Sequence, residues 1–137
     1  MAVVLDSDVV VGFLDRSDAL HEAADLALRE LAATQPLFVS IITYAEVLTG
    51  ARIGHHSLAT VDAFFTDAIS RIIPVDLEIG ERAAELRAAN KALKMPDALI
   101  LASAETDPKV GLLLSGDRNL VRVDGLECEI RLLSEAP

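Results

Sequence analysis

Four short apolar runs, separated by longer segments with helical periodicity, constrain the fold of this chain more than any other feature. The runs are Ala2–Leu5, Leu37–Ile41, Arg71–Val75 and Val110–Leu114, with a weaker fifth at Glu129–Leu132. Runs that are apolar at successive positions are typical of parallel strands covered by helices on both faces. We therefore expect one α/β domain over residues 1–137, a three-layer α/β/α sandwich around a parallel sheet of four to five strands.

The segments between these runs carry start and stop signals for helices. Asp18 is a typical N-cap for a helix that runs to about Thr34, and Pro96 suits the first turn of a helix that runs through Ser103. Three further helices are expected over residues 43–53, 57–70 and 77–93.

Carboxylates follow the predicted strands from widely separated parts of the chain. Asp6 comes directly after the first run, and Asp117 comes shortly after the fourth. Glu46 lies early in the helix after the second run, and Asp97 lies in the first turn opened by Pro96. In open α/β sheets, ligands bind at the carboxyl ends of the strands. We therefore expect the four carboxylates to meet at one edge of the sheet.

Such a cluster has a chemical consequence. Carboxylates that lie together repel one another and raise one another's pKa values unless a cation is present. Mg²⁺ and Mn²⁺ prefer oxygen ligands, and a cation held in this way can activate water against a phosphodiester. Any single Asp here could instead be a helix cap or turn former. A role as a cap or turn former does not explain Glu46, because it interrupts an apolar helical segment where burying a lone carboxylate would cost free energy.

Four stretches of the sequence together resemble the PIN-domain family, and in particular the VapC-type toxins of bacterial toxin–antitoxin systems. They are Val3–Val10, Ser40–Gly50, Met95–Ala104 and Leu113–Leu120. The resemblance implies an endoribonuclease that depends on Mg²⁺ or Mn²⁺. It assigns metal binding and catalysis to four residues, Asp6, Glu46, Asp97 and Asp117.

Two positions depart from the usual pattern of the family. Asp8 stands where the family often has a neutral polar residue, and it could add a metal ligand or only cap the segment Val9–Leu14. Ser115 stands where Thr is frequent, which keeps a hydroxyl beside the expected metal. Both are treated as supporting residues of the candidate site.

The net charge of −10 argues against a nucleic-acid substrate when it is taken alone, because Lys and Arg drive phosphate binding. The objection weakens if the acids are concentrated in a metal pocket, or if a basic partner accompanies the protein. The resemblance implies such a partner, a VapB-like antitoxin, beside the RNA substrate. It also implies a homodimer, which the surplus of Ala and Leu on the helices favours independently.

Few basic residues are candidates for binding RNA. Arg118 follows Asp117 and is the best single candidate. A weaker set is expected on one face of the helix over residues 77–93 and just beyond, where it could form a phosphate track or a solvated face paired with Glu81 and Glu85. The set consists of Arg87, Lys91 and Lys94.

The histidines and the cysteine are not expected to take part in the chemistry. His21, His55 and His56 lack metal-ligand spacing and are interpreted as surface residues. Cys128 is the only cysteine, so no internal disulfide can form, and it is expected to be a small buried apolar residue. Together with the absence of a basic leader or a membrane-length apolar run, this favours a cytoplasmic location with no membrane partner.

Two other functions remain open at this point. The run Asp6–Val10 and the pair Gly116–Asp117 also resemble motifs of haloacid-dehalogenase-type phosphatases. That interpretation leaves Glu46 and Asp97 unexplained, and the chain is short for such an enzyme. The second alternative is a catalytically inactive PIN-fold interaction domain, whose sequence sign would be the loss of one of the four acids.

Overall fold

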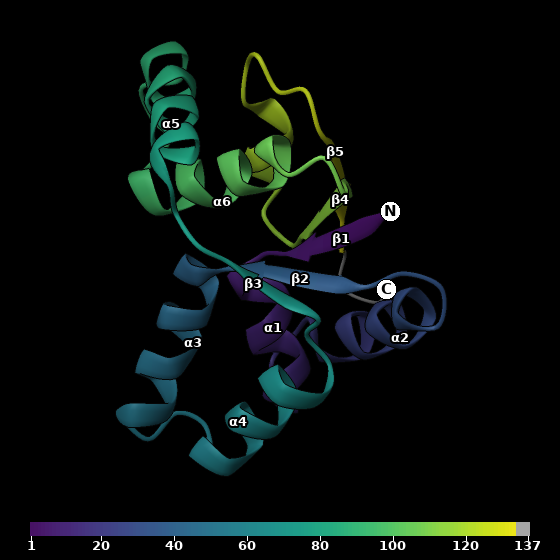
Figure 1. Cartoon of the computed structure of the whole chain (residues 1–137). Coiled ribbons are helices and arrows are strands. Elements are labelled where there is room, and N and C mark those ends of the chain that lie inside the picture. Colours follow the sequence, from purple (N-terminus) through teal and green to yellow (C-terminus); the bar gives the residue numbers. More distant parts are fainter. Residues whose placement is uncertain (134–137) are drawn as a thin grey trace.

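The computed structural model describes residues 1–133, which form one five-stranded sheet with helices on both faces (Figure 1). The strands are β1 (Ala2–Leu5), β2 (Leu37–Ser40), β3 (Arg71–Ile73), β4 (Val110–Ser115) and β5 (Glu129–Leu132). Every neighbouring pair is parallel, in the order β3-β2-β1-β4-β5. The predicted three-layer architecture is confirmed, and the weaker fifth strand is part of the sheet.

The helices divide between the two faces of the sheet (Figure 1). One face carries α1 (Ser7–Leu14), α2 (His21–Ala32), α3 (Ile41–Arg52) and α4 (Leu58–Asp67). The other carries α5 (Leu77–Ala89) and α6 (Met95–Thr106), and the short 3₁₀ helix η1 (Arg118–Arg122) follows β4. Over residues 1–133, no helix combines the length and the apolar character needed to cross a membrane.

Alternate residues along each strand build two separate cores. On β1, Val3 and Leu5 face the core shared with α1 to α4, whereas Val4 faces the core shared with α5 and α6. All three are fully buried. This two-sided burial explains why the strands read as continuous apolar runs.

The chain reverses its direction of sheet building beside β1. It adds β2 and then β3 on one side of β1, and later returns to add β4 on the other side. Such a switch point leaves a crevice at the carboxyl ends of the central strands. The order of strands therefore places the ends of β1 and β4 at the natural ligand site of the fold.

Several element boundaries differ from those predicted, and local hydrogen bonds explain the differences. The second strand ends at Ser40, because the Ser40 hydroxyl accepts from the amide of Ile42 and starts α3 two residues early. The third strand ends at Ile73, before Pro74, which has no N–H to give to a sheet. Asp18 does not cap α2; its carboxylate accepts from the amide of Leu20 in the turn before the helix.

The largest boundary error concerns α5, which ends at Ala89 rather than Leu93. The side-chain amide of Asn90 donates to the carbonyl of Leu86 at 2.8 Å and to that of Asp124 at 3.0 Å. Asn90 thus ends the helix and ties it to a distant loop. Lys91 and Lys94 lie outside the helix, so the predicted basic helical face does not exist.

Candidate active site

The four predicted acids come from four elements around the switch point. Asp6 caps α1 directly after β1, and Asp117 caps η1 shortly after β4. Glu46 lies on α3, and Asp97 lies in the first turn of α6. The structure therefore places all four where the sheet topology predicts a ligand site.

Asp6 is the most buried of the four, with 6% of its surface exposed. One carboxylate oxygen accepts from the amide of Ser7 at 2.7 Å, and the other accepts from the hydroxyl of Ser115 at 2.7 Å. Burial, together with the charges of Asp8 and Asp97, raises the pKa of Asp6 to about 7, and the two hydrogen bonds only partly oppose this rise. Asp6 therefore lacks a positive partner that would stabilise its charge.

Ser115 connects two of the acids. Its hydroxyl donates to Asp6 and accepts from the amide of Asp117 at 3.0 Å. Because Ser115 is fully buried at the end of β4, these bonds fix the position of Asp6 relative to Asp117. The hydroxyl expected beside the acids is present.

Asp97 lies close enough to Asp117 and Glu46 for their charges to affect its pKa. Its pKa is raised first by burial and then by the charges of Asp117 and Glu46, while Lys94 lowers it. Within residues 1–133, however, no three acidic, His or Cys side chains lie close enough to form a ready-made ligand group. The acids share one electrostatic environment rather than a closed set of ligands.

The donor set nevertheless fits a hard divalent cation. All the side chains that meet here offer oxygen atoms, which Mg²⁺ and Mn²⁺ prefer. The pKa values of Asp6 and Asp97 are raised first by burial and then by neighbouring acids, and Lys94 offsets this only in part at Asp97. A cation bound here would stabilise these charges.

A hydroxyl that sequence reasoning missed holds Glu46 in place. The Ser7 hydroxyl donates to Glu46 Oε1 at 2.8 Å and lies 3.1 Å from the hydroxyl of the buried Thr43. Ser7 belongs to the motif between Asp6 and Asp8, so its place beside the acids could have been inferred. Its hydrogen bond to Glu46 could not have been inferred, because the packing of α1 on α3 brings the two residues together.

The carboxylate of Asp8 has a structural partner. Both of its oxygens accept from the amide of Gly116, at 3.0 and 3.1 Å, which ties the start of α1 to the end of β4. It does not cap α1, since Asp6 does so. A side chain at position 116 would approach Leu20 Cδ1 to 2.6 Å and Asp8 Oδ2 to 2.9 Å, which explains the glycine there.

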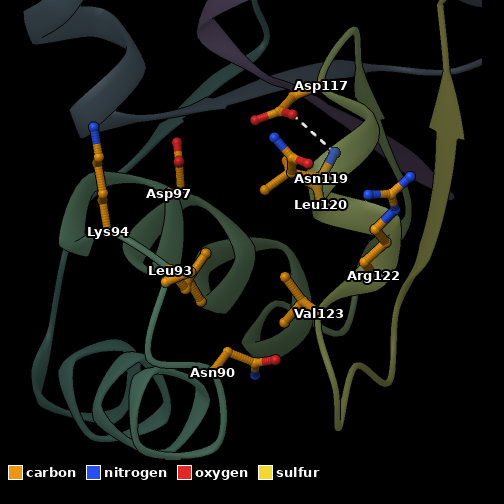
Figure 2. A pocket seen from close by; sticks show the side chains of 10 residues that line it. Asn90, Leu93, Lys94, Asp97, Asp117, Asn119, Leu120, Arg122 and Val123 are labelled. Atoms are coloured by element: carbon orange, nitrogen blue, oxygen red, sulfur yellow. Dashed lines mark hydrogen bonds between the residues drawn. The ribbon is translucent and has the colours of Figure 1, made fainter.

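The basic residues are distributed differently from the prediction. The Arg87 guanidinium donates to the carbonyl of Leu93 at 2.9 Å and so supports the turn after α5. Lys94 lies beside Asp97, as Figure 2 shows, whereas Lys91 is exposed in the turn. Arg118 is exposed at the start of η1.

The remaining titratable residues lie away from the acids. His21 contacts the carbonyl of Gly12 through Nδ1 at 2.9 Å, and His55 and His56 follow α3 in a loop. Cys128 packs against the core beside α5 and α6, and burial raises its thiol pKa to about 11. It is partly rather than fully buried.

The chain belongs to the PIN-domain family, since the model of the PIN domain matches residues 3–126. No curated protein matches its sequence significantly. Because the chain belongs to this family, the phosphatase interpretation is not retained.

Solved structures with the same fold come from toxin–antitoxin systems. A toxin–antitoxin complex from Klebsiella pneumoniae is 27% identical, with a TM-score of 0.73 over 98% of this chain and 99% of that chain. VapBC2 from Rickettsia felis, bound to a promoter DNA fragment, is 17% identical, with a TM-score of 0.79 over 98% and 100%. VapC20 from Mycobacterium tuberculosis, a toxin that cleaves the sarcin-ricin loop, is 19% identical, with a TM-score of 0.68 over 93% and 98%.

Proposed function

We propose that this chain is an endoribonuclease that depends on Mg²⁺ or Mn²⁺ and acts as the toxin of a VapBC-type pair. One observation carries the proposal: a buried carboxylate, Asp6, has its pKa raised to about 7 at the switch point of a PIN fold, with Asp97 close enough to raise it. Uncompensated carboxylates of this kind are characteristic of sites that hold a cation.

Asp6, Asp97 and Asp117 would hold the cation directly or through water, and Glu46 would complete the shell. When bound, the cation would supply positive charge to the phosphodiester and acidify a water molecule. Ser115 orients Asp6 through its hydroxyl. Ser7 occupies Glu46 Oε1, which leaves Oε2 to orient the attacking water and accept its proton.

Cleavage of RNA by the purified chain tests the enzymatic part of this proposal. We expect cleavage with Mg²⁺ or Mn²⁺ and none in EDTA. Asp97→Asn should lower the rate about 100-fold or more, because it removes a proposed ligand. Asp62→Asn removes the same charge from an exposed position on α4 and should leave the rate unchanged. Equal rates for the two variants would refute the role of Asp97.

The toxin assignment draws support from the toxin–antitoxin structures that share this fold. We expect expression of the chain alone to arrest growth, and co-expression of a cognate VapB-like antitoxin to restore it. Asp6→Ala at matched protein level should abolish the arrest. If wild type and Asp6→Ala cells grow equally well, the chain is not a toxin, and an inactive interaction domain with the PIN fold becomes the better interpretation.

The charge of the chain supports an antitoxin that ends in a basic segment. A net charge of −10 and an uncompensated acidic site would steer a cationic segment toward Asp6, Glu46, Asp97 and Asp117. An Arg or Lys there could pair with the carboxylates and displace the cation. We also propose a homodimer in the cytoplasm; light scattering that finds only monomer at micromolar concentration would contradict the dimer.

A further inference from the structure

A cavity of about 520 Å³ adjoins the acidic site and is not used by the proposed chemistry. It lies between η1 and the segment that joins α5 to α6, and Asp97 and Asp117 are part of its wall (Figure 2). Its volume falls within the range of about 300–1,000 Å³ that small-molecule sites occupy. It can therefore hold a group larger than a metal ion and its water.

The walls of the cavity combine apolar surface with an amide. Leu93 and Leu120 are 8% and 2% exposed, and Val123 lies across the cavity from Leu93 (Figure 2). Asn119 also lines the cavity, and its side chain makes no hydrogen bond to any residue that the structure describes. Aliphatic walls with an uncommitted amide can hold a heteroaromatic ring that has polar edges.

Two cations line the same cavity. Lys94 and Arg122 have no ion pair within 4.0 Å among residues 1–133, unlike Arg71 and Arg82. Lys94 also precedes α6 as its N-cap residue, and no side chain caps that helix end. Free cations and an open helix N-terminus both attract phosphate. Asp97 and Asp117 line the same cavity, so it presents two cations beside the acidic site rather than a net positive charge.

The outer wall of the cavity is fixed without any ligand. The Asn90 side chain accepts from the amide of Asp124 at 2.7 Å and donates to its carbonyl at 3.0 Å. One residue further on, the carbonyl of Gly125 accepts from Arg82 at 2.7 Å. These bonds join the loop after η1 to α5, so the cavity is built into the fold.

We propose that this cavity binds one unstacked base of a single-stranded RNA, next to the phosphodiester that the acids attack. The inference rests on the proposed function and names a subsite for its substrate. The base inserts between Leu93 and Val123, Asn119 contacts its edge, and Lys94 and Arg122 contact the flanking phosphates. Enzymes that act on single-stranded nucleic acid commonly hold a base between apolar side chains in this way.

Binding of ribonucleoside 5′-monophosphates tests the proposal without using cleavage as the readout. The probes are AMP, GMP, CMP and UMP, titrated into isotope-labelled Asp6→Asn protein and followed by NMR. Ribose 5-phosphate and inorganic phosphate serve as control ligands. We expect at least one nucleotide to shift the amide signals of Leu93, Asn119 and Leu120, and to bind about tenfold more tightly than ribose 5-phosphate.

A pair of matched variants locates the binding. Ala92 is exposed and lines the cavity, so Ala92→Leu fills the cavity without disturbing the core and should weaken nucleotide binding about tenfold. Ala59→Leu makes the same change at an exposed position on α4 and should have no effect. Equal shifts with ribose 5-phosphate, or equal binding by the two variants, would overturn the base site. If the base site fails this test but the wild type still cleaves RNA, the proposed nuclease function stands. If nucleotides bind but RNA is not cleaved, the nuclease function is refuted and the base site stands.

Discussion

Two buried carboxylates, Asp6 at the end of β1 and Glu105 on α6, show what separates a structural acid from a functional one. The side chain of Glu105 is 2% exposed, yet it accepts from Arg82 Nε at 2.9 Å and from the amides of Glu127 and Cys128. Asp6 is nearly as buried but has acids and no cation around it, and its pKa rises to about 7. Arg82 therefore compensates the buried charge of Glu105, which holds a loop, whereas no cation compensates the buried charge of Asp6 at the switch point.

The difference teaches that burial alone does not mark a functional acid. At Glu105 the charge and its hydrogen bonds fix the loop from Gly125 to Cys128 against α5 and α6. At Asp6 the fold retains a destabilising arrangement, which is typical of sites whose activity requires it. Neutralising the two acids should therefore have opposite effects on stability, and only one should affect the chemistry directly.

The largest expected effect is the loss of activity in Asp6→Asn. The amide oxygen of Asn can retain the N-cap of α1, and its NH2 group can donate to the Ser115 hydroxyl in place of the bond that Asp6 accepts, so the fold should persist. Cleavage of RNA should fall about 100-fold or more, while the free energy of unfolding at pH 7 should stay equal or rise. A variant that keeps wild-type activity, or that unfolds more easily, would break the contrast with Glu105.

The next effect is a loss of stability in Glu105→Gln. This change leaves the mostly buried Arg82 guanidinium without its main ionic partner, which should lower the free energy of unfolding by about 3 kcal/mol. Glu85 bonds the same guanidinium at 3.1 Å but is 67% exposed, so Glu85→Gln should cost less than about 1 kcal/mol. Urea unfolding of both variants measures the difference, and equal losses would contradict a structural role for burial at Glu105.

A third effect is the pH dependence of stability in the metal-free protein. The folded pKa of Asp6 lies above the unfolded value of 3.8, so the native state binds more protons than the unfolded state between pH 4 and pH 7. Stability should therefore fall as pH rises through this window, by on the order of 2 kcal/mol. Asp6→Asn should flatten this part of the curve in EDTA. An unchanged slope would show that Asp6 titrates normally.

The smallest effect concerns Gly116, which follows β4 and contacts the carboxylate of Asp8. In Gly116→Ala the new methyl group must displace Leu20 and the Asp8 carboxylate, at a cost of about 1–2 kcal/mol. Gly80 lies in α5 with open space around it, so Gly80→Ala should instead stabilise the protein by about 0.5–1 kcal/mol. Thermal unfolding of the pair checks the signs, and two changes of the same sign would contradict the close contact at Gly116.

The acids and the sheet could be predicted from the sequence, because both leave local patterns. Strands buried on both faces read as apolar runs, and acids that follow such runs converge at one edge of a parallel sheet. The Arg82–Glu105 pair left no such pattern, since 23 residues separate its members and the packing of α5 on α6 brings them together. The end of α5 was missed for a similar reason: Asn90 is held there by Asp124, which is 34 residues away.

The role of Asp8 also depended on tertiary structure. Its position after β1 allowed both a metal ligand and a cap, and only the approach of Gly116 from β4 decides where its carboxylate points. The cavity beside Asp97 was not predicted at all. It exists because α5 ends early and lets residues Asn90–Lys94 form a turn facing η1.

Calorimetric titration of Mn²⁺ into the metal-free protein tests most directly whether the acids at the switch point bind a divalent cation. We predict saturable binding by the wild type, binding at least about tenfold weaker in Asp97→Asn, and unchanged binding in Asp62→Asn. Absence of Mn²⁺ uptake by the wild type, or equal affinity in all three proteins, would contradict the account.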